Sequence, residues 1–215
     1  MTHSVDKSCV VSVAFRSPYV QHSERQEQVI RDMTPFVSYY AYRDCLPMKD
    51  RIETVDIVTR FQESLYGFKP HAIQRMRDKG FKKVIWFDPS VLPTVSVKCI
   101  LNALDEHPVI TRAGENNVAE MTNRKTLDWF GVVPEELRDV KHVAGTVYAF
   151  NFDNPKAVEV FELWKRCEEE GMFGTQDDFM AGSWCDESAM SLSLYKCNVN
   201  QVWCDFQYLN QKEMP

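Results

Sequence analysis

The chain has 215 residues, of which 44% are hydrophobic, and carries a formal net charge of −6. This length and apolar content suit one compact α/β domain with a sizeable core. The acidic balance argues against nucleic acid as the main partner, because binding to a phosphate backbone requires a clustered basic face. It does not exclude a small anionic ligand, for which one Lys or Arg in a cleft is sufficient.

The 7 cysteines include no CxxC pair and lie mostly in apolar stretches. We therefore expect reduced thiols that pack as small hydrophobic side chains, with no metal ribbon and no redox motif. The N-terminal sequence MTHSVDKSCVVSVAF has no secretory pattern, and no run of about eighteen apolar residues predicts a membrane span. These features predict a cytoplasmic protein.

Strands alternate with helices in the apolar pattern of the chain. In chain order we expect a strand over 9–15, helix 23–33, strand 36–42, helix 50–66, helix 70–79, strand 84–87, helix 94–106, strand 108–112, a polar loop over 113–125, strand 143–152, a helix from Asn154-Pro155, helix 186–195 and strand 199–204. Ser23, with Gln26 three positions on, is the predicted N-cap of the first helix.

This alternation predicts a mixed, mainly parallel sheet that is flanked by helices on both faces. We expect a single domain over residues 1–215. The polar ending at 211–215 is typical of a linker, so this domain is also compatible with a longer polypeptide.

Ligands of such sheets bind outside the carboxyl ends of the strands. In this chain that rule selects Phe15 and Arg16, then Tyr42 and Arg43, and then Asp88. A carboxylate directly after the buried strand VIWF is held rigidly, and it suits a divalent cation that bridges to a diphosphate. The alternative is that Asp88 only caps the next helix or satisfies the amides of an Asp-Pro turn. Its position favours neither interpretation.

The block YGFKPHAIQRMRDKGFKKVIWFDPSVLP, residues 66–93, resembles the region of GT-A glycosyltransferases that leads into their acidic metal-binding motif. In that family a hydrophobic strand delivers acids that bind a metal and the sugar-nucleotide. The resemblance implies a Rossmann-like GT-A fold, with Asp88 as a ligand of Mn²⁺ or Mg²⁺. Ser90 stands where the family has its second acid, and the resemblance implies that it contacts a metal-bound water or the ribose.

The segment WCDESAMSLSLYKCN, residues 184–198, resembles a motif of several GT-A families, among them the retaining family of the blood-group A and B transferases. The resemblance implies that Glu187 is the catalytic nucleophile or stabilises an oxocarbenium-like transition state. It implies that Asp186 contacts sugar hydroxyls or steers Glu187. Such chemistry requires a carboxylate close to a carbon that becomes positive. In the alternative interpretation, both acids only stabilise a helix N-terminus.

Lys69 and Arg16 are candidate ligands of the donor diphosphate, because the leaving group needs positive charge besides the metal. Lys69 is alternatively an ordinary solvated lysine. Tyr42, Tyr66 and Phe15 are candidates to stack on the base or to close the site, or else they belong to the core.

Together these features predict a transferase that moves a hexose or deoxyhexose from a UDP-sugar to a glycan or glycoprotein, with retention slightly favoured because of Glu187. The chain is also similar to the small glycosyltransferase domains encoded by large algal (chlorella) viruses, which would place it in the host cytoplasm. Two alternatives stay open. One is a nucleotidyltransferase, against which the lack of glycine in AFRSPYV counts. The other is a non-catalytic nucleotide-sugar-binding module that has lost the second acid at Ser90. His142 is interpreted as structural.

Overall fold

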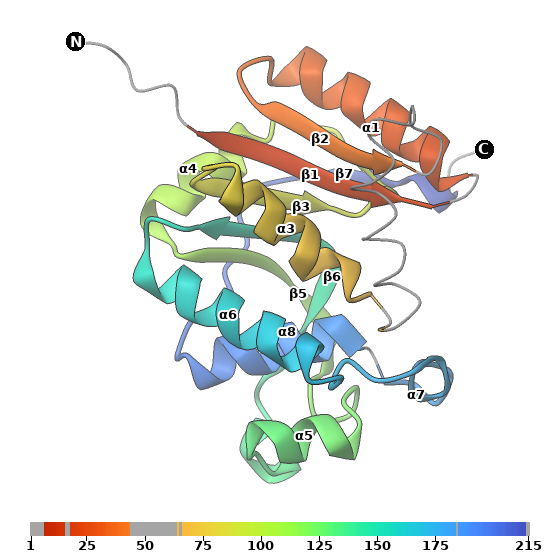
Figure 1. Ribbon diagram of the computed structural model, residues 1–215, viewed down its shortest axis with the longest axis vertical. Coiled ribbons are helices and arrows are strands. Elements are labelled where there is room, and N and C mark those ends of the chain that lie inside the picture. The colour runs from red at the N-terminus through yellow and green to blue at the C-terminus, as the bar shows by residue number, and fades with distance from the viewer. Residues whose placement is uncertain (1–6, 16–17, 44–63, 65, 184, 214–215) are drawn as a thin grey trace.

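The computed structural model describes residues 7–15, 18–43, 64, 66–183 and 185–213 (Figure 1). Its centre is a sheet with the strand order β2-β1-β3-β6-β5. The strands are β1 (Ser8–Ala14), β2 (Ser38–Arg43), β3 (Lys83–Phe87), β5 (Val109–Asn117) and β6 (Lys141–Asn151). β1 pairs in parallel with β2 and β3, whereas β6 pairs antiparallel with β3 and β5. Only β6 therefore opposes the other strands of this sheet, and the predicted mixed, mainly parallel sheet is confirmed.

Helices cover both faces of the sheet, as predicted (Figure 1). One face carries α1 (Tyr19–Met33) and α4 (Lys98–Glu106), and the other carries α3 (Phe68–Asp78), α6 (Pro155–Glu169) and α8 (Cys185–Lys196). Successive strand residues point to opposite faces. Ile85 accordingly packs in the cluster under α1 and α4, whereas Val84 and Trp86 belong to the cluster under α3, α6 and α8.

A two-stranded antiparallel sheet brings the C-terminal part of the chain to the turn after β3. It consists of β4 (Val91–Pro93) and β7 (Tyr208–Asn210). The remaining described elements are α5 (Arg124–Phe130), the 3-10 turns η1 (Pro134–Leu137) and η2 (Gln211–Glu213), and α7 (Gln176–Met180). None of the helices in the described part of the chain is both long and apolar enough to cross a membrane.

Three predictions about individual elements are wrong. Residues 199–204 are irregular, because Val202 and Trp203 pack against the core beside α4 without joining a strand ladder. β5 continues to Asn117 through residues predicted as loop, with register shifts after Thr111 and Ala113. The helix expected over 94–106 begins only at Lys98, since the residues before it lead out of β4.

The predicted start of the first helix is also wrong. α1 begins at Tyr19, so Ser23 lies inside the helix and is buried. Its hydroxyl accepts a hydrogen bond from the Arg43 guanidinium (3.0 Å) and does not cap the helix. The helix expected over 50–66 falls almost wholly outside the described residues.

The core behind the carboxyl end of β3 is expected to dominate stability. Phe87 is fully buried and stacks on Phe206, with ring centroids 5.3 Å apart. We expect Phe87→Ala to lower the free energy of unfolding by about 3–5 kcal/mol, because it removes apolar contacts and leaves a cavity. The matched control is Phe36→Ala, since Phe36 is 59% exposed. Its effect should stay within about 0.5 kcal/mol in urea unfolding, and equal effects of the two variants would contradict this assignment of the core.

Candidate functional site

A cavity of ≈ 310 Å³ lies at the edge of the sheet where the parallel strands end. It is lined by Tyr66, Lys69, Asp88, Ser90, Gly145, Thr146, Phe179, Asp186, Glu187 and Lys212. Asp88 directly follows β3, Lys69 lies in the first turn of α3, and Glu187 lies in the first turn of α8. A larger hollow of ≈ 620 Å³ surrounds Tyr195 and Asn198, but its lining includes a single acid. The cavity at the sheet edge is therefore the better candidate for chemistry.

Lys69 and Asp186 form a buried ion pair in this cavity. The Lys69 Nζ lies 2.6 Å from the Asp186 Oδ2, and the two side chains are 4% and 3% exposed. The Tyr148 hydroxyl donates to the same oxygen (3.1 Å), and the Trp164 indole donates to the Asp186 backbone carbonyl (3.0 Å). Lys69 also donates to the Gly145 carbonyl (3.2 Å). Each charge therefore has a partner, which burial requires.

Lys69 stays a cation in this setting. Burial lowers its pKa, but the charges of Asp186, Asp88 and Glu187 outweigh burial, so the pKa of Lys69 is raised. Its Nζ also lies over three aromatic rings, whose faces attract a cation. These rings, with distances to their centroids, are Tyr66 (4.9 Å), Trp86 (5.8 Å) and Tyr148 (5.6 Å). The ammonium predicted to bind a diphosphate thus already binds Asp186.

Asp88 is fixed by contacts from three sides. Its Oδ1 accepts the backbone N–H (2.8 Å) and the hydroxyl (2.5 Å) of Ser90. Its own N–H donates to the Thr146 carbonyl (2.9 Å), and its carbonyl accepts from the Gln26 amide (2.8 Å). The turn role considered from the sequence is therefore present. The turn contacts involve the Oδ1 of Asp88, so Oδ2 is the carboxylate oxygen that can bind a ligand in the cavity.

The fit of a divalent cation depends on this second oxygen. The part of the chain that the structure describes contains no group of three or more His, Cys, Asp or Glu side chains that could hold a metal. Mg²⁺ and similar ions are often held by one or two carboxylates, with substrate phosphates and water completing the shell. Asp88 fits a cation of that kind, for which the protein supplies one carboxylate and the diphosphate and water supply the other ligands.

Glu187 lies against Gly145. The Glu187 Oε1 accepts the Gly145 N–H (2.6 Å), and the side chain is 16% exposed. A Cβ at position 145 would lie 2.6 Å from Oε1 and 2.9 Å from the Lys69 Nζ, so only glycine leaves room for these two side chains. Burial and then the charge of Asp186 raise the pKa of Glu187 to about 8, and the unliganded site thus favours the neutral acid near pH 7.

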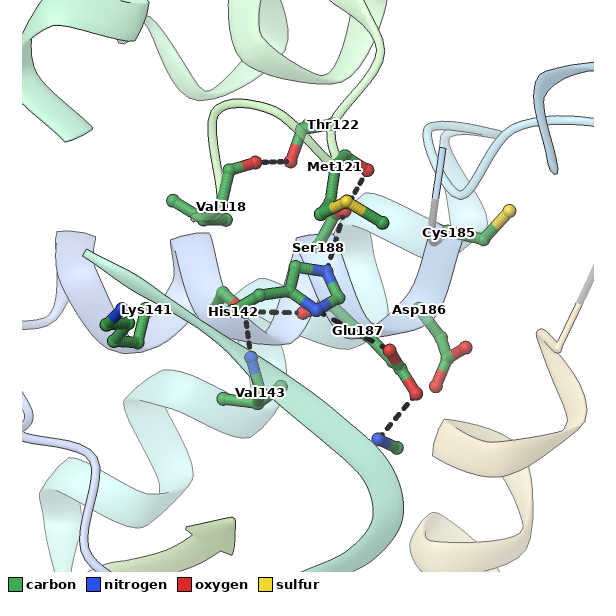
Figure 2. A network of polar contacts seen from close by, with 12 residues as sticks. Val118, Met121, Thr122, Lys141, His142, Val143, Cys185, Asp186, Glu187 and Ser188 are labelled. Atoms are coloured by element: carbon green, nitrogen blue, oxygen red, sulfur yellow. Dashed lines mark hydrogen bonds and ion pairs between the residues drawn. The ribbon is translucent and has the colours of Figure 1, made fainter. Parts of the chain in front are cut away.

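The site residues that were not predicted from the sequence include His142, which was interpreted as structural, and Lys212. Because β6 runs against β3, its N-terminal half lies at the ligand edge, and the His142 Nδ1 comes within 3.5 Å of the Glu187 Oε2 (Figure 2). Burial lowers the pKa of His142 to about 4, against a smaller opposite effect of a hydrogen bond with the Val143 backbone. A lone histidine before a strand gives no sign of this contact, since the apolar pattern does not reveal strand direction.

Three of the residues predicted for the donor site, Arg43, Tyr42 and Phe15, make their contacts in other parts of the fold. The Arg43 guanidinium bonds the Ser23 hydroxyl (3.0 Å) and the Glu27 carboxylate (2.8 Å), which ties β2 to α1. Tyr42 is buried in the core, and Phe15 packs edge-on against the ring of Phe68 at 5.4 Å. None of these three is among the described residues that line the cavity, and Arg16 lies outside the described residues.

Comparison with known proteins gives a likeness of fold. No model of a known protein family and no curated protein matches the chain. Mouse xyloside xylosyltransferase 1 is similar over 89% of this chain and 82% of its own, with 7% identity and a TM-score of 0.51. A glycosyltransferase involved in the glycosylation of the major capsid of PBCV-1 is similar over 79% of this chain and 69% of its own, with 14% identity and a TM-score of 0.44. The galactosyltransferase LgtC, in complex with donor and acceptor sugar analogs, is similar over 83% of this chain and 71% of its own, with 12% identity and a TM-score of 0.46. The xylosyltransferase likeness, together with the sheet described above, confirms the GT-A fold.

The raised pKa of Glu187 predicts a pH-dependent stability. Folding raises this pKa from 4.5 to about 8, so the folded state binds the proton more tightly. The resulting stability is full below pH 4.5 and is lost as the pH rises towards 8. Glu187→Gln mimics the neutral acid and should be more stable than the wild type at pH 8, by roughly 1–3 kcal/mol, with little difference at pH 4.5. Urea unfolding across this range measures the difference, and a gap that does not change with pH would contradict the assignment.

Proposed function

We propose that this chain is a glycosyltransferase that moves a hexose or deoxyhexose from a UDP-sugar to a glycan or glycoprotein acceptor. The observation that carries the proposal is the convergence of Lys69, Asp88 and the Asp186–Glu187 pair on one cavity at the ligand edge of a GT-A sheet. Sheets of this kind bind ligands at that edge. The xylosyltransferase with the same fold is also a sugar transferase by name.

Four residues of the cavity besides Glu187 have distinct parts in this proposal. Asp88 would hold Mn²⁺ or Mg²⁺, and the bound ion would neutralise the diphosphate that leaves the sugar. Lys212 lines the same cavity and adds a positive charge for the phosphates. Ser90 orients Asp88 through two hydrogen bonds. Asp186 is a positioning residue, because Lys69 and Tyr148 hold its carboxylate in place.

Glu187 is the catalytic carboxylate of the proposal. Its Oε1 is anchored by Gly145, so the group is fixed at the wall of the cavity. With retention, its carboxylate faces the anomeric carbon as that carbon becomes positive. With inversion, it instead takes the proton of the attacking acceptor hydroxyl. Both roles require the ionised form of Glu187.

Binding of UDP tests the donor site. We expect UDP to bind more tightly with Mn²⁺ than without it, and Asp88→Asn to lose at least about tenfold of this metal-dependent affinity, since the ion would lose its protein carboxylate. Calorimetric titration with UDP, with and without Mn²⁺, measures both effects. The control is Asp205→Asn, a change at an exposed acid outside the cavity lining. Unchanged UDP affinity in Asp88→Asn would rule out the proposed role of Asp88.

Turnover tests the role of Glu187. We expect Glu187→Gln to bind UDP as the wild type does and to lose about 10²–10⁴ in turnover, because the amide cannot carry the negative charge or accept a proton. The assay is transfer or hydrolysis of UDP-glucose and UDP-galactose, with the anomeric configuration of the first product read by NMR. An inverted product would remove the nucleophile role and leave Glu187 as the base. Wild-type binding of UDP without turnover of any donor would favour the non-catalytic module.

A further inference from the structure

Three polar side chains from different strands form a chain of hydrogen bonds that ends in the cavity. The Arg112 guanidinium on β5 donates to the hydroxyl oxygen of Tyr208 on β7 (2.5 Å), and the Tyr208 hydroxyl lies 3.1 Å from the Thr146 Oγ1 on β6. Arg112 also lies over the Tyr208 ring, 5.5 Å from its centroid. Thr146 lines the cavity, whereas Arg112 and Tyr208 lie outside its described lining. A positive charge outside the cavity is thus connected to a hydroxyl inside it.

An irregularity in the strand ladder places Thr146 at this position. The register shifts between Thr111 and Arg112, so residues 145–147 of β6 have no partner on β5. Such bulges redirect side chains and are common beside active sites. On the other side of β6, the Thr146 carbonyl accepts the Asp88 N–H (2.9 Å). Thr146 is therefore held next to the residue that we propose as the metal ligand.

The chemistry of the two hydroxyls decides which of them donates. A guanidinium only donates, so Tyr208 accepts from Arg112 and has its one hydrogen left to give. Donation by a cation polarises the phenol and makes it a better donor and a poorer acceptor. A phenol is also more acidic than an aliphatic alcohol. Tyr208 therefore donates to the Thr146 Oγ1, and the hydroxyl hydrogen of Thr146 remains for a ligand in the cavity.

We propose that Thr146 binds a phosphate oxygen of the donor diphosphate, and that Tyr208 is the positioning residue that orients the Thr146 hydroxyl. This inference rests on the proposed function and deepens it. Phosphate oxygens are anionic, and they accept hydrogen bonds more strongly than the neutral hydroxyls of a sugar do. Thr146 is bonded to Asp88 through the backbone, and Lys212 lines the same cavity. The groups around Thr146 thus suit a diphosphate.

Titration with UDP and with uridine tests this contact. Thr146→Val keeps the shape of the side chain and removes the hydroxyl. Its affinity for UDP in the presence of Mn²⁺ should fall about ten- to a hundredfold, as is typical when a hydrogen bond to a charged group is lost. Its affinity for uridine, which has no phosphate, should match that of the wild type. Thr146→Ser retains the hydroxyl and should restore most of the affinity for UDP.

Three results would overturn the phosphate contact. The first is wild-type affinity for UDP in Thr146→Val. The second is an equal loss for UDP and uridine, because the change would then act on the cavity as a whole. The third is a normal affinity for UDP with a raised KM for UDP-glucose, which would place the Thr146 hydroxyl on the sugar.

A double-mutant cycle tests the role of Tyr208. In the otherwise unchanged chain, Tyr208→Phe should weaken UDP binding about three- to tenfold, because Thr146 loses the group that orients its hydroxyl. In the Thr146→Val background the same change should have no effect, since Tyr208 acts only through Thr146. Equal losses in both backgrounds would overturn the positioning role. The control is Tyr195→Phe, a change at a half-buried tyrosine outside the cavity lining, and it should leave the UDP affinity unchanged.

The outcomes separate this inference from the proposed function. A wild type that binds no UDP, with or without Mn²⁺, would defeat both together. A wild type that binds UDP and transfers a sugar, with Thr146→Val indistinguishable from it, would overturn the inference alone. The proposed roles of Asp88 and Glu187 would then stand, because the variants of those residues are measured separately.

Discussion

The ion pair between Lys69 and Asp186 is the constraint on which the site depends. Both groups are almost fully buried, and removing one partner of such a pair typically costs about 3–5 kcal/mol because the other charge is left alone. The pair joins the first turn of α3 to the first turn of α8, so the two helices cannot shift independently. Glu187 follows Asp186 directly, so the ion pair also holds Glu187 in its place beside Gly145. The Lys69–Asp186 ion pair thus contributes both to the stability of the protein and to the order of the site.

The reversed direction of β6 is the second requirement. In a wholly parallel sheet the carboxyl end of this strand would reach the ligand edge, and its N-terminal half would lie at the far side. Because β6 opposes β3, its residues from His142 to Thr146 come to the edge instead. They supply a backbone acceptor for Lys69, a backbone donor for Glu187 and a ring nitrogen beside the same carboxylate. A glycine in the middle leaves room for both charged side chains.

Much of the fold and part of the site could be predicted from the sequence. The buried strands could be located along the chain because they are apolar runs, and Asp88 could be located because it follows one of them, but the order of the strands in the sheet was not predicted. The position of Arg43 at a strand end says nothing about side-chain direction, and that side chain turns to α1. His142 could not be found because its partner lies 45 residues away on a helix, across a strand whose direction the pattern does not encode. The wrong strand over 199–204 has a similar cause, since apolar residues can pack without forming a ladder.

The pairing of β7 with β4 has a consequence for how the site arises in the cell. Gln211 donates to the carbonyls of His22 and Pro89, and Lys212 reaches the cavity beside residues made much earlier. Synthesis proceeds from the N-terminus, so the strands of the main sheet leave the ribosome before β7 does. The sheet can therefore assemble around β3 first, whereas the cavity wall is closed only when the chain beyond residue 208 has emerged. An unfinished polypeptide would hold the acids of the site without the segment that encloses them.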